Sequence, residues 1–189
     1  MHDSASLAAF VKPRLIVLID LAGYTKSYQS NDDLHIAAMV QDYYALCTAA
    51  IGGAGGTLIK FMGDGCLATF APEDAPRAVE TLVALTAEIE LLAKRYQLSI
   101  ALGANVHLAS VVEGSFGGRL DVLGRGVNQT FLLGGGRGIR LSEPAYRALP
   151  SDARSPWAKH KPPAIYTLDQ PAHGLDGQGK RGAANAIRW

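Results

Sequence analysis

Two aspartates occupy positions where a carboxylate is unusual. Asp20 ends a run of apolar residues in LIVLIDLAGYT, and Asp64 lies between two glycines in KFMGDG. A charge at the edge of an apolar strand is costly unless it is paired or bound to a cation. Mg²⁺ binds a few carboxylates together with substrate phosphate oxygens, and a pair of such ions can activate an attacking oxygen and stabilise a leaving one. Taken alone, the pattern leaves open that Asp20 caps a turn and that Asp64 is an ordinary turn residue.

The order of the predicted elements would bring these two carboxylates together. Hydrophobic periodicity predicts a strand, a helix, a two-stranded hairpin, a helix and a strand, at residues 14–21, 32–51, 57–62 with 66–70, 73–96 and 98–108. This is the βαββαβ order of the ferredoxin-like arrangement, in which helices cover one face of a sheet that contains antiparallel strands. The first strand and the hairpin are neighbours there, so Asp20 and Asp64 can converge.

Shorter elements follow the ferredoxin-like unit. A possible extension of the last strand at 111–112, a short strand, two helices and a final strand are predicted at residues 121–123, 124–133, 144–149 and 164–168. The predicted fold class is therefore α/β (α+β), with C-terminal additions. We expect a leader at residues 1–12, one domain at 13–169, and a flexible tail at 170–189 because that segment is rich in Gly and Ala.

Composition restricts the class of protein. A chain of 189 residues with 48% hydrophobic residues suits one globular domain. The net charge of +1 argues against a nucleic-acid partner. The sequence contains no apolar run of about 18 residues, so we expect no membrane span. The first residues also lack the features of a signal peptide. Cys47 and Cys66 lie in apolar segments, which favours reduced core thiols in a cytoplasmic protein.

Four segments together resemble the catalytic domain of class III adenylate/guanylate (nucleotidyl) cyclases. They are LIDLAGYT, KFMGDG, NVHLASVVEG and DVLGRGVN, and the resemblance runs from residue 14 to 168. It implies a cyclase homology domain that converts a nucleoside triphosphate into a 3′,5′-cyclic nucleotide and pyrophosphate. It also implies two divalent metal ions, Mg or Mn, as cofactors.

The resemblance assigns roles to individual residues. Asp20 and Asp64 would bind the metal ions with the backbone carbonyl of Leu21. Gly23, Tyr24 and Thr25 would contact the phosphates, and Lys60 and Asp121 would contact the base. Asn128 would contact the ribose. Lys159 would contact the triphosphate, with Lys161 as the alternative lysine.

The base-reading pair favours ATP as substrate. A lysine can donate to adenine N1 and a carboxylate can accept from the exocyclic amine, whereas guanine offers the reverse pattern. Outside the motif, Lys60 could be a solvated strand lysine and Asp121 a loop residue. Two alternatives stay open. One is a pyrimidine cyclase that uses UTP or CTP in bacterial anti-phage signalling, and the other is a non-catalytic nucleotide-binding module of the same fold.

In the family each site is shared between two chains, so the resemblance implies a head-to-tail homodimer with two equivalent sites. One chain supplies the aspartates, and the other supplies the base-reading pair, the asparagine and the phosphate lysine. A monomer of this chain should therefore be nearly inactive.

One position departs from the family pattern. The family has an arginine four residues after its ribose-positioning asparagine, where this chain has Leu132. Leucine cannot stabilise charge on the phosphates, which leaves three explanations: a slow enzyme, an inactive one, or another arginine in this role. We expect the third, because the metal-binding aspartates and the base-reading pair are kept. Arg125 is the first candidate, because it lies three residues before Asn128, and Arg119 and Arg137 are further candidates.

Three other features have ordinary interpretations. His107 is predicted to be a structural residue on a strand, and Arg137 and Arg140 are predicted to be surface charges beside a glycine-rich segment. The segments GGAGG and GGGRG lack the neighbouring residues of phosphate-binding loops.

Overall fold

The structure, a computed structural model, describes residues 7–160 and 164–168. Its strands are β1 (Val11–Ala22), β2 (Thr57–Met62), β3 (Gly65–Phe70), β4 (Ala101–Phe116), β5 (Arg119–Leu123), β6 (Gly138–Ser142), β7 (Ala158–His160) and β8 (Ile165–Leu168). Its helices are α2 (Tyr24–Ser30), α3 (Asp33–Gly53), α4 (Ala75–Arg95), α5 (Arg125–Phe131) and α6 (Glu143–Arg147). Single 3₁₀ turns lie at η1 (Ala8–Phe10), η2 (Pro72–Asp74) and η3 (Ser151–Arg154).

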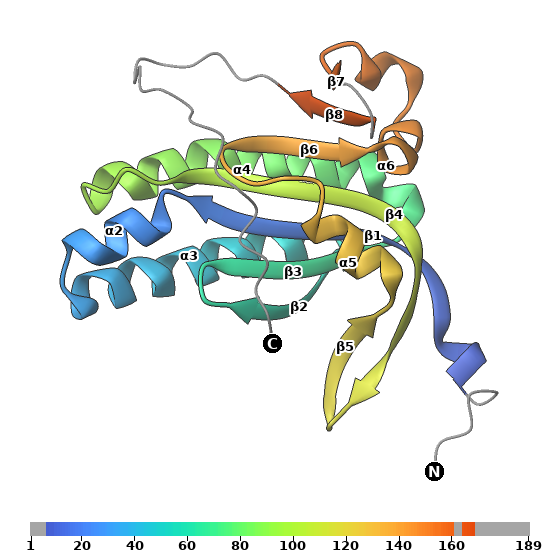
Figure 1. Cartoon of the computed structure of the whole chain (residues 1–189), viewed down its shortest axis with the longest axis horizontal. Coiled ribbons are helices and arrows are strands. Elements are labelled where there is room, and N and C mark those ends of the chain that lie inside the picture. The colour runs from blue at the N-terminus through green and yellow to red at the C-terminus, as the bar shows by residue number, and fades with distance from the viewer. Residues whose placement is uncertain (1–6, 161–163, 169–189) are drawn as a thin grey trace.

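A single sheet runs through the described part of the chain (Figure 1). Its strand order is β2-β3-β1-β4-β6-β8-β7, and β5 pairs with β4 outside this path. Strand β1 is antiparallel to both β3 and β4, and β6 is parallel to β4. The order β4-β1-β3-β2 with α3 and α4 is the predicted ferredoxin-like unit, so the predicted fold class is confirmed.

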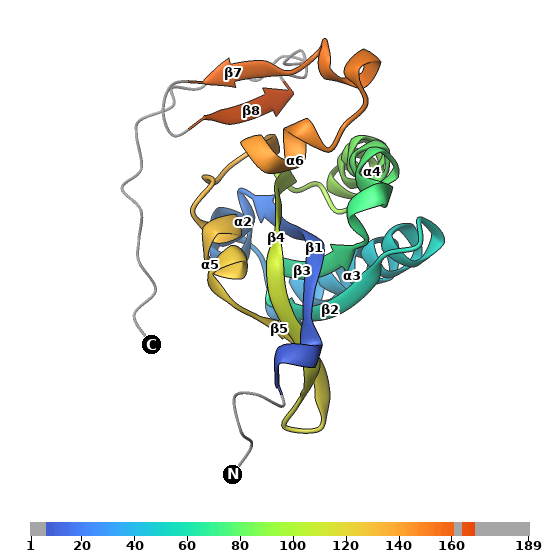
Figure 2. The ribbon, with the colours of Figure 1, turned by 90° about the vertical axis from the view of Figure 1, so that its right-hand side faces the viewer.

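Both faces of β1 are covered, which explains its uninterrupted apolar sequence. Helices α3 and α4 pack on one face, and α5 lies on the other (Figure 2). Leu15, Val17 and Ile19 are buried in the larger core with α3 and α4, while Ile16 belongs to a second cluster beneath α5. Asp20 follows the same alternation as Ile16, so it belongs to the α5 face of the sheet.

Local chemistry sets the helix boundaries. The side chain of Asp32 accepts a hydrogen bond of 3.0 Å from the backbone N–H of His35 and so caps the start of α3. Pro76 lies in the first turn of α4, where its missing N–H has no cost. Among the described residues, no helix is long and apolar enough to cross a membrane.

The structure differs from the sequence expectations in several places. Strand β1 already begins at Val11, inside the expected leader, because Val11 pairs with Val112. Strand β4 is one continuous element, where the sequence predicted a strand ending at residue 108 and a kink. Helix α2 and strands β6 and β7 were not predicted. The expected tail at 170–189 lies outside the described residues.

Candidate active site

Asp20 and Asp64 meet where β1 ends beside the β2–β3 turn. Ile19 of β1 pairs with Cys66 of β3, and the two strands are antiparallel. Asp20, the residue after Ile19, therefore lies beside the turn that precedes Cys66 and holds Asp64. Burial raises the pKa of Asp20, and the negative charge of Asp64 raises it further. Burial also raises the pKa of Asp64, and hydrogen bonds from the backbone of Asp64 itself and of Leu21 partly offset this rise. Both carboxylates therefore lie in a setting that disfavours their charge and that a cation would relieve.

A glycine leaves the space for Asp20. Gly103 pairs with Asp20 across β4 and β1. A Cβ atom at Gly103 would lie 2.1 Å from Oδ1 of Asp20 and 2.6 Å from the carbonyl oxygen of Gly136. No side chain fits there without displacing the carboxylate. Sequence reasoning missed this residue, because its role depends on a pairing between strands distant in sequence.

Arg140 is not the surface charge that the sequence suggested. It is half-buried on β6, and its Nη2 donates to the carbonyl oxygens of Gly135, Gly136 and Arg137 at 2.6, 2.9 and 3.0 Å. Its positive charge lowers the pKa of Asp20, opposing the effects of burial and of Asp64. Arg140 therefore holds the glycine-rich loop next to the aspartates, while Arg137 itself is exposed, as expected.

Helix α3 supports the turn that carries Asp64. The hydroxyl of Tyr44 donates a 2.6 Å hydrogen bond to the carbonyl of Gly63. The Tyr44 ring stacks on Phe61, with ring centroids 3.7 Å apart and planes 9° from parallel. The residue before Asp64 is thus fixed by a side chain from another element.

The expected phosphate-contacting residues begin α2 directly after β1. Gly23 precedes the helix with φ of 89°, and a Cβ there would lie 2.2 Å from the carbonyl oxygen of Ser99. Both the backbone conformation and the close approach require glycine. Tyr24 and Thr25 occupy the first turn, where backbone N–H groups lack partners within the helix.

Lys60 and Asp121, 61 residues apart in sequence, form an ion pair. Lys60 Nζ lies 2.7 Å from Asp121 Oδ2, joining β2 to β5. The second oxygen of Asp121 accepts from the backbone N–H of Val122 at 2.8 Å. The side chains are 41% and 23% exposed, which leaves the pair accessible to a ligand.

Comparison with solved structures shows which known fold this chain has. The guanylyl cyclase Cya2 superimposes with a TM-score of 0.73 and 22% identity over 86% of this chain and 96% of its own. The adenylyl cyclase CyaB from P. aeruginosa gives a TM-score of 0.74 and 16% identity over 88% of this chain and 98% of its own. The fold is that of a class III cyclase catalytic domain.

A sequence relative agrees with the cyclase fold. An adenylate cyclase from Anabaena cylindrica is 26% identical over 133 residues, which cover 64% of this chain and 26% of the relative. This chain therefore matches about a quarter of that protein's length. No family model matches the sequence. The expected resemblance to class III cyclases is nevertheless confirmed by these structures and this relative.

The other expected site residues of the cyclase fold do not join the aspartates within one chain. Asn128 and Arg125 are exposed on α5, and Leu132 follows this helix with 81% of its surface exposed. Lys159 is exposed on β7, which three strands separate from β1. The alternative lysine at 161 lies outside the described residues, and Arg119 is exposed on β5.

The donor set around Asp20 suits Mg²⁺ or Mn²⁺. No group of three or more His, Cys, Asp or Glu side chains gathers at a metal-binding distance within residues 7–160 and 164–168. Mg²⁺ does not need one, because it commonly uses one or two carboxylates, with water and substrate phosphates completing its shell. Asp20 and Asp64 are close enough for the charge of Asp64 to raise the pKa of Asp20, so two carboxylates are available at one place for such an ion.

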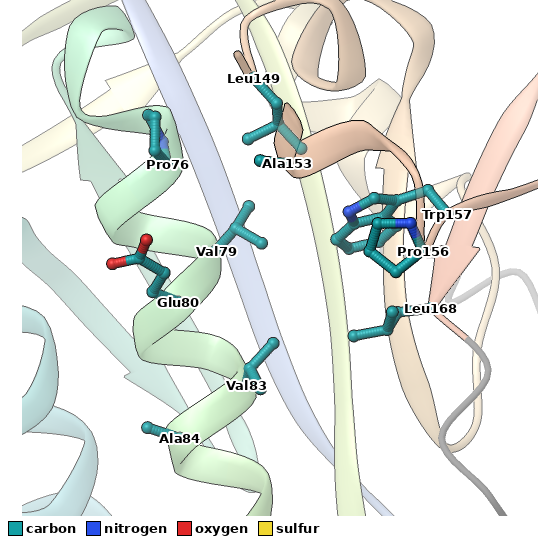
Figure 3. Close-up of a pocket in the computed structure, with 10 residues that line it drawn as sticks. All are labelled: Pro76, Val79, Glu80, Val83, Ala84, Leu149, Ala153, Pro156, Trp157 and Leu168. Atoms are coloured by element: carbon teal, nitrogen blue, oxygen red, sulfur yellow. The ribbon is translucent and has the colours of Figure 1, made fainter. Parts of the chain in front are cut away.

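An apolar cavity of about 360 Å³ lies elsewhere, between α4 and the C-terminal segments (Figure 3). Val79, Val83 and Trp157 are among its lining residues, and Glu80 is the charged one. None of the candidate site residues lines it. The cavity is therefore separate from the aspartate pair, and nothing in the cyclase fold assigns it to the nucleotide.

Proposed function

We propose that the chain is the catalytic domain of a nucleotide cyclase, which converts a nucleoside triphosphate into a 3′,5′-cyclic nucleotide and pyrophosphate. The observation that carries this proposal is the convergence of Asp20 and Asp64 within a cyclase fold. Burial and mutual repulsion raise the pKa of Asp20, so the pair is poised to accept cations. A cytoplasmic location stays a prediction.

In the proposed mechanism Asp20, Asp64 and the Leu21 carbonyl would hold two Mg²⁺ or Mn²⁺ ions. When bound, such ions lower the pKa of an attacking hydroxyl and neutralise charge on a leaving group. The 3′-oxygen forms a bond to the α-phosphorus, the bond from that phosphorus to the pyrophosphate oxygen breaks, and the hydroxyl proton passes to water or to Asp20. We assign the β- and γ-phosphates to the backbone N–H groups of Gly23, Tyr24 and Thr25, which begin α2 and would be free to donate to them.

Residues of a second copy would complete the site. We assign Asn128 to the ribose and Lys159 to the triphosphate, both in trans, because neither joins Asp20 within the chain. Four apolar side chains on and beside β5 and α5 are exposed, which supports a partner surface there: Leu120, Leu123, Phe131 and Leu132. Head-to-tail pairing of two such chains gives two equivalent sites.

Mixing two inactive variants tests the shared site. Asp20→Asn and Asn128→Ala chains should each be inactive alone, because every site in either homodimer lacks one part. After subunit exchange, one of the two sites in a heterodimer is wild type, so up to about a quarter of wild-type activity should return at equal mixing. Cyclic nucleotide formation measures this recovery. If labelled chains exchange and no activity returns, the shared site is wrong.

The ion pair between Lys60 and Asp121 favours ATP. We expect wild-type protein with Mn²⁺ to form more cyclic product from ATP than from GTP, UTP or CTP. Asp121→Ala should reduce the ratio of kcat/KM for ATP over the other triphosphates by about tenfold, because it removes the acceptor for the adenine amine. Product identification by mass spectrometry checks both statements. A wild-type preference for UTP or CTP would instead support the pyrimidine cyclase.

Leu132 supports a second candidate function, that of a non-catalytic nucleotide-binding module. Its exposed leucine cannot donate to a phosphate where the family has arginine. We favour the enzyme, with Arg125 supplying the missing charge, because Arg125 is exposed on the same helix as Asn128. If the protein binds a triphosphate but forms no cyclic product with either Mg²⁺ or Mn²⁺, the result would support the non-catalytic nucleotide-binding module.

A further inference from the structure

His107 on β4 is buried, with 8% of its surface exposed, and both of its ring nitrogens are hydrogen-bonded. Its Nδ1 lies 2.8 Å from the hydroxyl oxygen of Ser142, at the end of β6. Its Nε2 lies 3.0 Å from Oε1 of Gln129, on α5. Ser142 in turn accepts a 3.3 Å bond from the backbone N–H of Ala145 and caps α6. One imidazole therefore joins three elements on the α5 face of the sheet.

The hydrogen bonds of His107 fit a neutral ring that is protonated at Nε2. The amide oxygen of Gln129 can only accept, so Nε2 carries the proton and donates. Nδ1 is then the acceptor, and the hydroxyl of Ser142 donates to it while accepting from Ala145. Burial lowers the pKa of His107, which agrees with a neutral ring. Both ring nitrogens of His107 therefore have a partner.

Helix α5 needs such contacts because it has only seven residues. A helix this short does not hold its own conformation in water, so packing must fix its direction. At its first turn Gly126 touches the sheet, where a Cβ would lie 2.5 Å from Cβ of Ala109 and 3.2 Å from Cδ1 of Ile16. Near its last turn the bond from His107 to Gln129 provides the second fixed point. Asn128 lies between these two points in sequence and is exposed.

We propose that His107, acting through Gln129, is a positioning residue that sets the direction in which α5 presents Asn128 to the nucleotide. This inference rests on the proposed function, because it assigns His107 to the ribose-contacting half of the shared site. The contact differs from ordinary core packing in that it depends on one acceptor atom. Gln129 itself is exposed, so a side chain of the same length without that acceptor should leave the buried core unchanged and α5 misdirected.

Three variants separate positioning from packing. Gln129→Met removes the acceptor and keeps the length of the side chain, whereas Gln129→Glu keeps an acceptor for Nε2. Gln41→Met is the matched control, since Gln41 is exposed on α3. We expect Gln129→Met to lower kcat by about tenfold, equivalent to about 1.4 kcal/mol, with a melting temperature close to that of Gln41→Met. Gln129→Glu should restore most of kcat.

Hydrogen exchange of the α5 amides in the free chain gives a readout that does not depend on turnover. Gln129→Met should exchange these amides faster than wild type, and Gln129→Glu should not. The inference is overturned if Gln129→Met keeps kcat within about twofold of wild type, if α5 exchange is unchanged, or if Gln129→Glu fails to rescue. Absence of cyclic product from the wild type would instead contradict the proposed function, while the exchange data would still test the contact.

Discussion

Asp20→Asn and Asp64→Asn should each abolish turnover and leave the fold intact. An asparagine keeps the shape of the side chain and loses the charge, so one carboxylate would remain where the proposed metal pair needs two. We expect a loss of at least roughly 10²–10³-fold in kcat for each variant. Steady-state assays with saturating Mn²⁺, together with melting curves, would measure turnover and folding.

The stability of these two variants provides a control within the same experiment. The pKa of Asp20 is raised in the folded protein above its ordinary value of 3.8. The metal-free protein should therefore lose stability as the pH rises from about 3.8 through the raised pKa of the folded state, because the folded state must then give up a proton that it binds more tightly than the unfolded chain does. Asp20→Asn removes this loss, so the metal-free variant should be at least as stable as wild type at neutral pH. The exposed Asp33→Asn serves as the matched substitution. Near-normal turnover in either folded site variant would contradict the metal assignment.

Gly103→Ala should also inactivate the protein, although it changes no group with a chemical role. The new methyl carbon would lie 2.1 Å from Oδ1 of Asp20 and 2.6 Å from the backbone oxygen of Gly136. The Asp20 side chain would have to leave its position, so both turnover and metal affinity should fall, with kcat lower by about 10²-fold or more. Mn²⁺ titration and turnover, measured on the folded variant, test this expectation.

Gly114→Ala is the control for Gly103→Ala. Gly114 lies in the same strand, and a Cβ there would meet only ordinary contacts, the nearest at 3.6 Å on the Phe10 ring. We expect it to retain activity. Equal activity and equal metal affinity in the two alanine variants would show that Asp20 does not need the space that Gly103 leaves.

The elements that the sequence predicted well are those with a strong local signal. The hairpin of β2 and β3 agrees with its expected limits to within one residue, because two β-rich runs flank the tight Gly63-Asp64-Gly65 turn. The central strand was recognisable because both of its faces are buried. The convergence of Asp20 and Asp64 then followed from the βαββαβ order rather than from any single residue.

The elements that the sequence did not predict have weak hydrophobic periodicity, and the residue roles that it did not predict depend on contacts between residues far apart in the sequence. Helix α2 reads YTKSYQS, with one buried residue and no apolar stripe, and β7 has three exposed residues. Strand β4 carries Ala109 and Ser110 at its middle, which resemble a break although the strand continues. The roles of Gly103 and Arg140 depend on strand register, which residue types alone do not determine.

The uninterrupted length of β4 has a consequence for the proposed dimer. The strand pairs with Asp20 at Gly103 and with Asp121 at Gly114. At about 3.4 Å per residue, these points are separated by roughly 37 Å of hydrogen-bonded backbone. In a head-to-tail dimer the first point belongs to one site and the second to the other. If one nucleotide shifted this strand, the base-reading carboxylate of the opposite site would move with it, so we expect binding at the two sites of the proposed dimer to be cooperative.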